Sequence, residues 1–201
     1  LLRDVLGDAE EAAACFREVR TLRDDDEALD ALVEHTRAMD LHAELAELLA
    51  KRLSQPTTPE EAIELGMERA TLLLDHLGDA REAERELLAI RERDPAFAPA
   101  LARLGSFYID EGDDEALAEV SEAHLELMTH PVQRATLAKR LFGIYERSIP
   151  DAEKALSAAR RWAQAAPTDL DALRALAERL DPATDARERV KALEARADEL
   201  I

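Results

Sequence analysis

The chain has 201 residues, of which 26 are basic and 45 acidic, giving a formal net charge of −19 at pH 7. Such an acidic chain repels nucleic acid and anionic membranes, so we expect neither as a partner and favour a protein partner. No apolar run approaches the roughly 18 residues that span a bilayer, and the first residues do not resemble a signal peptide. We therefore expect a cytoplasmic location, while export of a longer parent protein stays open.

Helices are the only regular structure that the sequence predicts. Hydrophobic residues make up 47% of the chain but aromatic residues only 3%, so a core has to be built from alanine and leucine in closely packed helices. Apolar residues recur at helical spacing, as at Leu101, Leu104 and Tyr108, and no segment alternates as a strand would. After a short remnant at 1–6, we expect helices near residues 8–22, 26–39, 41–54, 59–77, 79–93, 97–111, 113–128, 131–148, 151–166, 169–180 and 183–200.

Glycine, proline and aspartate mark the expected helix ends. Gly7, Gly78 and Gly112 each precede an acidic residue. This order is typical of a glycine that closes one helix and an aspartate that caps the next. Pro59 and Pro131 stand where two helices begin, and the first turn of a helix tolerates proline.

The same pattern repeats along the chain. The stretch Leu6–Ala12 recurs at Leu77–Ala83, 71 residues later, and at Ile149–Ala155, a further 72 residues on, with proline in place of glycine. Gly112 repeats the turn of Gly78 about half a period later, so the unit is near 35 residues and holds two helices. The expected helices at 59–77 and 131–148 are longer than the others, which indicates a two-unit superperiod.

Residues 94–117 allow a family comparison. They contain Asp94-Pro95, Ala98, Ala100-Leu101, Leu104-Gly105, Tyr108, Gly112-Asp113 and Glu115-Ala116. This pattern resembles the tetratricopeptide repeat (TPR), a helix-turn-helix unit of 34 residues, and weaker matches extend over nearly the whole chain. The resemblance implies an all-α, right-handed superhelical solenoid of stacked antiparallel helix pairs.

We expect residues 1–201 to form a single solenoid segment with about five helix pairs and a partial unit at the start. The segment would come from a longer protein. Arginine outnumbers lysine by 22 to 4, which together with the abundant alanine suggests a GC-rich bacterial genome.

No pattern of residues predicts catalysis, a metal or a cofactor. The six glycines are isolated, so the glycine-rich loops that cradle phosphates are missing from the sequence. The five histidines do not combine with cysteines or carboxylates at ligand spacing, and acidic runs such as Asp24–Glu27 are typical of helix caps. We expect no enzyme, no metal site and no cofactor, and we expect Trp162 to pack in the core.

The family resemblance also predicts a binding surface, because the first helix of each TPR pair lines a concave groove. The acidic members of the predicted set suit a basic ligand, whereas its arginines suit a carboxylate or an acidic strip. The alternative is that these side chains form solvated helix faces with ion pairs between neighbouring turns. By register, the groove residues are Asp30, Glu34, Arg37, Glu68, Asp75, Ser106, Arg140, Arg147, Arg174 and Glu178.

Two functions remain for such a chain. The first is a noncatalytic protein-interaction scaffold or adaptor that docks a peptide or a folded partner on the concave face. The second is an assembly or intramolecular regulatory module that mediates self-association or contacts other domains of its own chain.

Overall fold

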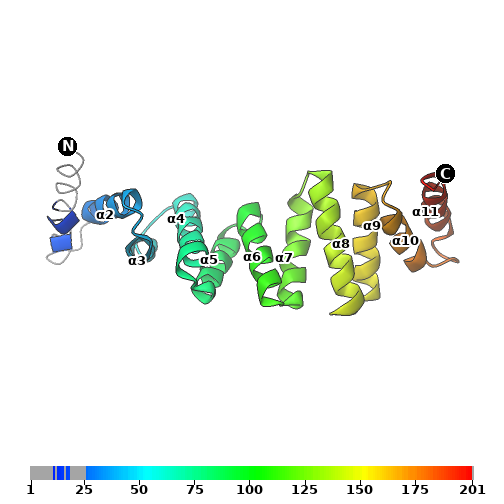
Figure 1. Ribbon diagram of the computed structural model, residues 1–201, viewed down its shortest axis with the longest axis horizontal. Coiled ribbons are helices and arrows are strands. Elements are labelled where there is room, and N and C mark those ends of the chain that lie inside the picture. The colour runs from blue at the N-terminus through cyan, green and yellow to red at the C-terminus, as the bar shows by residue number, and fades with distance from the viewer. Residues whose placement is uncertain (1–10, 12, 16, 19–25, 201) are drawn as a thin grey trace. The chain divides into compact units, whose positions relative to one another are not determined.

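The computed structural model describes residues 11, 13–15, 17, 18 and 26–200. Every regular element that it describes is a helix, which confirms the predicted all-α fold (Figure 1). The helix expected at 8–22 lies largely outside the described residues. The elements are α2 (Asp26–Ala38), α3 (His42–Leu53), α4 (Pro59–Leu72), the π-helix η1 (Leu73–Leu77), α5 (Ala80–Arg93), α6 (Ala98–Glu111), α7 (Asp114–Leu127), α8 (Pro131–Arg147), α9 (Ala152–Ala165), α10 (Leu170–Arg179) and α11 (Ala186–Asp198).

The helices pack as pairs of chain neighbours. α2 packs on α3, α4 on α5, α6 on α7, α8 on α9 and α10 on α11, and the α8–α9 contact is the most extensive. The chain divides into two compact units, with the boundary between Pro95 and Ala96. The first unit contains α2 to α5 and the second contains α6 to α11. The single continuous segment expected for residues 1–201 stays a prediction.

Two predicted helix boundaries are confirmed in detail. Gly78 and Gly112 adopt left-handed backbone conformations, with φ of 68° and 72°, which end η1 and α6. Asp79 then accepts a hydrogen bond from the Glu82 N–H at 3.2 Å, and Asp113 accepts one from the N–H of Ala116 at 3.0 Å. Each glycine therefore closes one helix and each aspartate caps the next.

Two other boundaries differ from the expected ones. The helix expected at 59–77 is continuous, but its last turn, Leu73–Leu77, is a π-turn, which accommodates an extra residue in a helix. The helix expected from 183 begins at Ala186, because Asp181 accepts hydrogen bonds from the backbone N–H groups of Ala183 and Thr184. That local turn competes with the first helical turn.

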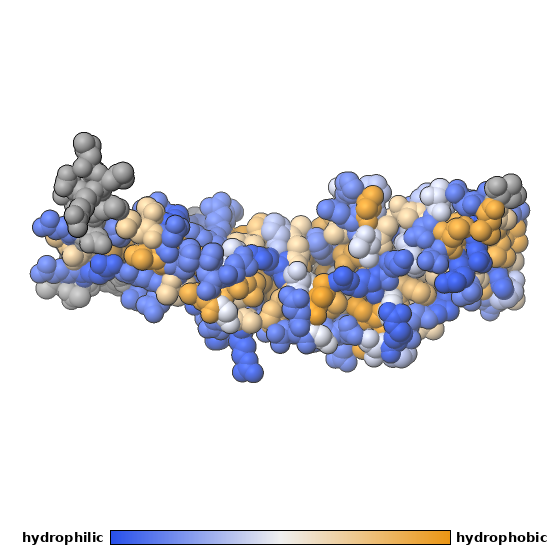
Figure 2. All heavy atoms as spheres, in the orientation of Figure 1, coloured by the Kyte–Doolittle hydropathy of each residue, from blue (hydrophilic) through white to orange (hydrophobic). Residues whose placement is uncertain are grey.

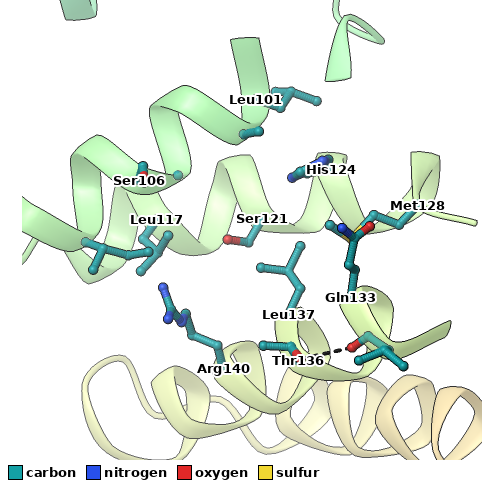
Figure 3. A pocket seen from close by; sticks show the side chains of 14 residues that line it. Leu101, Ser106, Leu117, Ser121, His124, Met128, Gln133, Thr136, Leu137 and Arg140 are labelled. Carbon is teal, nitrogen blue, oxygen red and sulfur yellow. Dashed lines mark hydrogen bonds between the residues drawn. The ribbon is translucent and has the colours of Figure 1, made fainter. Parts of the chain in front are cut away.

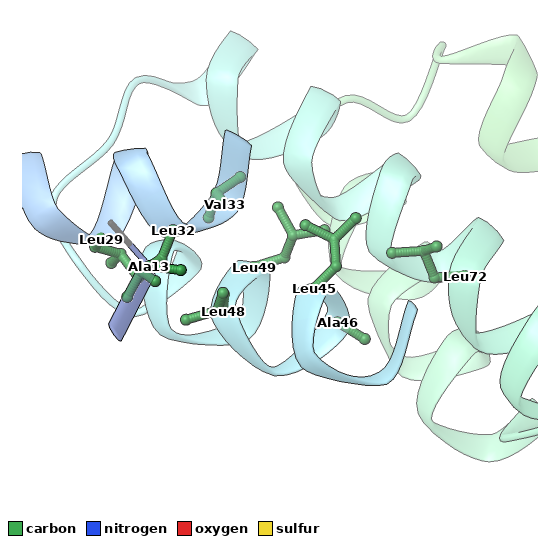
Figure 4. Packing of buried hydrophobic residues seen from close by; sticks show 9 residues of the cluster. All are labelled: Ala13, Leu29, Leu32, Val33, Leu45, Ala46, Leu48, Leu49 and Leu72. Carbon is green, nitrogen blue, oxygen red and sulfur yellow. The ribbon is translucent and has the colours of Figure 1, made fainter. Parts of the chain in front are cut away.

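The core of the first unit is mostly leucine. The cluster joins α2 and α3 and reaches α4 (Figure 4). Its side chains interleave across the helix pair, so neither helix buries its apolar face without the other. The members are Ala13, Leu29, Leu32, Val33, Leu45, Ala46, Leu48, Leu49 and Leu72.

Alanine sets the close packing of the second unit, as its abundance predicts. Ala100, Ala155 and Ala159 are fully buried, and so are large side chains of the same unit such as Leu104 and Leu141. Small residues at these positions allow helix backbones to approach, and the larger neighbours fill the remaining volume.

Trp162 is part of this core. Its exposed fraction is 4%, and its indole N–H donates a hydrogen bond to Asp169 at 3.1 Å. The expected packing role of Trp162 is confirmed.

Candidate functional site

A cavity of about 520 Å³ opens between α6, α7 and α8 in the second unit (Figure 3). Its walls are mainly apolar, and they include Leu101 from α6, Leu117 from α7 and Leu137 from α8. Ser106, Ser121 and Arg140 add polar groups at its border. We call this space the apolar cavity. Apolar walls with a few polar groups are typical of ligand sites.

Small residues keep the apolar cavity open. Ala102, Gly105 and Ser106 of α6 and Ser121 of α7 are among the residues that line it. A Cβ atom added at Gly105 would meet nothing closer than the Leu117 Cδ1 atom at 4.0 Å. Small side chains at these positions leave space between the larger side chains that form the walls.

A strip of cations borders this cavity. Arg140 lines the apolar cavity and two smaller ones of about 250 and 380 Å³, Arg147 lines both smaller cavities, and Arg174 lines the last of them. We call Arg140, Arg147 and Arg174, together with Lys139, the basic strip. Its arginines come from α8 and α10, as the family register predicts.

The two α8 arginines of the basic strip are unpaired. Arg140 and Arg147 are exposed and form no ion pair or hydrogen bond with the rest of the described chain. Arg174 forms only a long pair with Asp171 of its own helix, at 3.4 Å. The guanidinium groups of the strip therefore stay available to an anionic ligand.

Helix α8 is locally positive in an acidic chain. It contains Arg134, Lys139, Arg140 and Arg147 against a single acidic residue, Glu146. Arg179 of α10 neutralises that glutamate. Ligand anions that approach α8 thus meet a positive surface, although the whole chain carries a charge of −19.

Burial favours the neutral form of the histidine that lines the apolar cavity. Burial lowers the pKa of His124 below its usual range, because the charged imidazole loses hydration. The cavity therefore keeps an uncharged lining on its α7 side.

The predicted residues of the first unit lie in a different setting. Arg37 of α2 forms a bidentate pair with Glu68 of α4, with both N···O distances at 2.7 Å, and it also pairs with Glu34. The hydrogen bonds that Arg37 donates to Glu68, opposed in part by burial, raise the Arg37 pKa above its already high value. Asp30 accepts a hydrogen bond from Arg52 at 3.1 Å. Most of these charges are matched within the unit.

The remaining predicted residues are all exposed. Asp75 lies in η1, Ser106 lies on α6 at the edge of the apolar cavity, and Glu178 lies on α10. The structure brings Ser106 and Arg140 to one cavity and Arg140, Arg147 and Arg174 to another. A role of the ten residues in binding a partner stays a prediction.

The first unit also has a cavity, of about 570 Å³, but its buried cation is already engaged. Arg69 is 8% exposed, donates to the Ala46 carbonyl oxygen at 3.1 Å and pairs with Glu82 and Glu86. A guanidinium with three partners has little capacity for a ligand.

The sequence did not predict the apolar cavity itself. The sequence feature that corresponds to the cavity is the set of small residues on α6 and α7. This set indicates a cavity only when the two helices are placed beside α8. Within the described part of the chain, no group of three or more histidine, cysteine or acidic residues is placed to hold a metal ion. None of the described helices combines the length and the apolar character needed to cross a membrane.

Comparison with solved structures defines the class of protein. YrrB, a TPR protein with an unusual peptide-binding site, matches with 18% identity over 87% of this chain and 86% of its own, at a TM-score of 0.51. A TPR protein from Parabacteroides merdae matches with 16% identity over 96% of this chain and 74% of its own, also at a TM-score of 0.51. A MamA protein matches with 15% identity over 94% of this chain and 92% of its own, at a TM-score of 0.47.

The chain is therefore a TPR-like repeat protein in its fold, as the sequence pattern implied. No family model matches the chain, and no curated protein matches it by sequence.

Proposed function

We propose that the chain is a noncatalytic protein-interaction scaffold that binds a peptide segment of a partner protein in the apolar cavity and along the basic strip. One observation carries this proposal: an open apolar cavity lies beside unpaired arginines on α8, the first helix of its pair. The fold shared with YrrB, which has a peptide-binding site, supports it.

The dimensions of the surface favour a segment rather than a small molecule. The apolar cavity has room for a large side chain, and two further cavities continue from it because all three share Arg140. A peptide that lies across them buries side chains at several points while its backbone stays near the surface.

Peptide display on the intact chain tests this proposal. Peptides selected on the wild-type chain should lose most of their affinity for Gly105→Leu, since the new side chain fills the apolar cavity in a position with ordinary contact distances. They should keep their affinity for Arg187→Glu, which changes an exposed residue of α11 that lines none of the described cavities. Selected peptides that bind Gly105→Leu as tightly as the wild type would refute the proposed site.

The assembly function has its own supporting observation. Val190, Leu193 and Leu200 are 52%, 44% and 65% exposed on and just after α11, and Figure 2 shows hydrophobic atoms gathered over this helix. A self-associating chain would bury this face. Light scattering at high concentration separates the two functions, because a strictly monomeric chain counts against assembly.

A further inference from the structure

We infer that the ligand is an extended acidic peptide segment, with one apolar side chain in the apolar cavity and side-chain carboxylates on Arg140 and Arg147. This inference deepens the proposed function and rests on it. It assigns a ligand chemistry to the site, whereas the proposed function requires only that a peptide binds there.

The first step is the contrast between the arginines of the second unit. Arg160, Arg161 and Arg179 each pair with a glutamate of another helix. Arg140 and Arg147 lie exposed on α8 and pair with none of the described residues. Arginine binds carboxylates in a bidentate manner, so an acidic ligand supplies the partners that these two lack.

The second step is the spacing of the two cations. They are seven residues apart on one helix, which corresponds to about 10.5 Å along its axis. A single carboxylate is too small to reach both. An extended chain advances about 3.3 Å per residue, so carboxylates three or four residues apart match the two arginines.

The third step concerns the acidic groups of these cavities. Asp171 is the acidic lining residue of the 380 Å³ cavity, and it pairs with Arg174. Asp114 is the acidic lining residue of the 250 Å³ cavity, and it occupies the first turn of α7, where the helix dipole favours a negative charge. Both carboxylates have a local structural role, so the surface remains positive beside Arg140 and Arg147.

The fourth step places the apolar anchor. Arg140 lines both the apolar cavity and the two cavities beside Arg147, and Figure 3 shows its side chain next to Leu117 and Leu137. A ligand with its apolar side chain between α6 and α8 therefore has its next residues beside Arg140. The anchor and the first carboxylate are neighbours in the ligand sequence.

A titration of the full chain with synthetic peptides tests this inference. The probe is a short acetylated and amidated peptide with one leucine followed by alternating glutamate and serine. We expect it to bind at least about tenfold more tightly than its glutamine analogue and than its serine-for-leucine analogue, since each loses one class of contact. Isothermal titration calorimetry measures the affinities. Trp162, the single tryptophan, lines the cavity that holds Arg147 and provides a second signal.

Charge-neutral variants locate the interaction. Arg140→Gln with Arg147→Gln should remove the preference for glutamate over glutamine, while Arg187→Gln with Lys191→Gln, a matched change on α11, should keep it. All four are exposed side chains, so both double variants should retain the thermal midpoint of the wild-type chain.

The outcomes separate the inference from the proposed function. If Gly105→Leu abolishes the binding of selected peptides but glutamate and glutamine probes bind equally, the inference is wrong and the proposed function stands. If no selected peptide responds to Gly105→Leu, both fail. A probe that binds only with a free terminal carboxylate would also overturn the inference, because side-chain carboxylates would then not be the recognised groups.

Discussion

At the scale of single residues, the surroundings of a guanidinium decide what it does. Arg69 is 8% exposed and holds two glutamates and a backbone carbonyl, so its charge stabilises the packing of α3, α4 and α5. Arg140 is exposed and has no partner among the described side chains, so its charge is available for recognition. The sequence alone distinguishes them only through the family register, which placed Arg140 in the groove.

The buried guanidinium of Arg69 should be important for stability. Arg69→Met leaves the half-buried carboxylate of Glu86 without its cation and beside an apolar side chain, so we expect the free energy of unfolding to fall by about 3 kcal/mol. Arg85→Met removes an exposed pair with Glu82 on the same helix and should cost less than about 0.5 kcal/mol. Urea denaturation of the two variants compares them directly. Equal losses would show that burial does not set the strength of the Arg69 network.

The phenol of Tyr145 should make stability depend on alkaline pH. Burial first, and then the negative charge of Glu122, raise its pKa to about 12 from the usual value of 10. A raised pKa means that the folded chain keeps the proton while the unfolded chain loses it. This contribution is therefore fully present below pH 10 and is lost as the pH rises from about 10 to 12, by about 2 to 3 kcal/mol.

A difference measurement isolates that contribution. Denaturation of the wild type and of Tyr145→Phe between pH 9 and pH 12 should give stability curves that diverge, with the wild type losing more. Parallel curves would contradict the raised pKa. Titration of phenolate absorbance in Tyr108→Phe, which leaves Tyr145 as the one tyrosine, reports the same pKa independently.

At the scale of helices, two glycines differ in what an added methyl group would meet. At Gly66 in α4 it would lie 3.2 Å from the Cδ1 and Cγ1 atoms of Ile90, which is 1% exposed and confined. At Gly143 in α8 it would lie 2.8 Å from a terminal nitrogen of Arg147, which is exposed and free to move aside. The core therefore has no room for a methyl group at Gly66, whereas the Arg147 side chain can make room for one at Gly143.

Alanine substitutions should therefore have opposite effects. Gly143→Ala should stabilise the chain by up to about 1 kcal/mol, because alanine favours the helix. Gly66→Ala should make the chain less stable, because overpacking against Ile90 exceeds that gain. Thermal and urea unfolding give both values. Stabilisation by Gly66→Ala would show that the α4–α5 contact is looser than the structure indicates.

The caps test how well local sequence patterns define helices. Asp113→Ala removes the side chain that accepts the Ala116 N–H, so α7 should be destabilised by about 1 kcal/mol. Asp110→Ala, an exposed residue in the last turn of α6, is the matched control and should change stability little. A circular dichroism melt of each variant measures this, and a loss in the control as large as that in Asp113→Ala would contradict the capping role.

Helix boundaries such as those at Gly78 and Gly112 could be predicted because capping depends on adjacent residues. The π-turn of η1 and the late start of α11 could not, because the first depends on how α4 packs and the second on a competing turn at Asp181. The arginines of the basic strip were predicted by register. The apolar cavity was not, since it forms only where the small residues of α6 and α7 lie beside α8.

At the scale of the whole molecule, stability should be local. Each strong helix contact joins elements near one another in the chain, as expected for a repeat protein in which every pair rests on its neighbours. Leu49 is fully buried and belongs to the core cluster of the first unit. Damage to one unit should therefore leave the core of the other intact.

Hydrogen exchange can measure whether destabilisation stays within one unit. Leu49→Ala should lower the stability of the first unit by about 2 to 5 kcal/mol, and amide protection should fall in α2 to α5. Amides of α8 to α11 should keep their exchange rates. A uniform increase along the chain would indicate that the two units unfold as one.

The recognition of an acidic segment between α6 and α8 is tested most directly by photo-crosslinking. The acidic probe peptide, carrying a photoreactive leucine at its apolar position, should label side chains that line the apolar cavity, such as Leu101, Ser121 and Leu137. Gly105→Leu should suppress that labelling. Labelling confined to α9 or α11, or labelling of the cavity that persists in Gly105→Leu, would contradict the account.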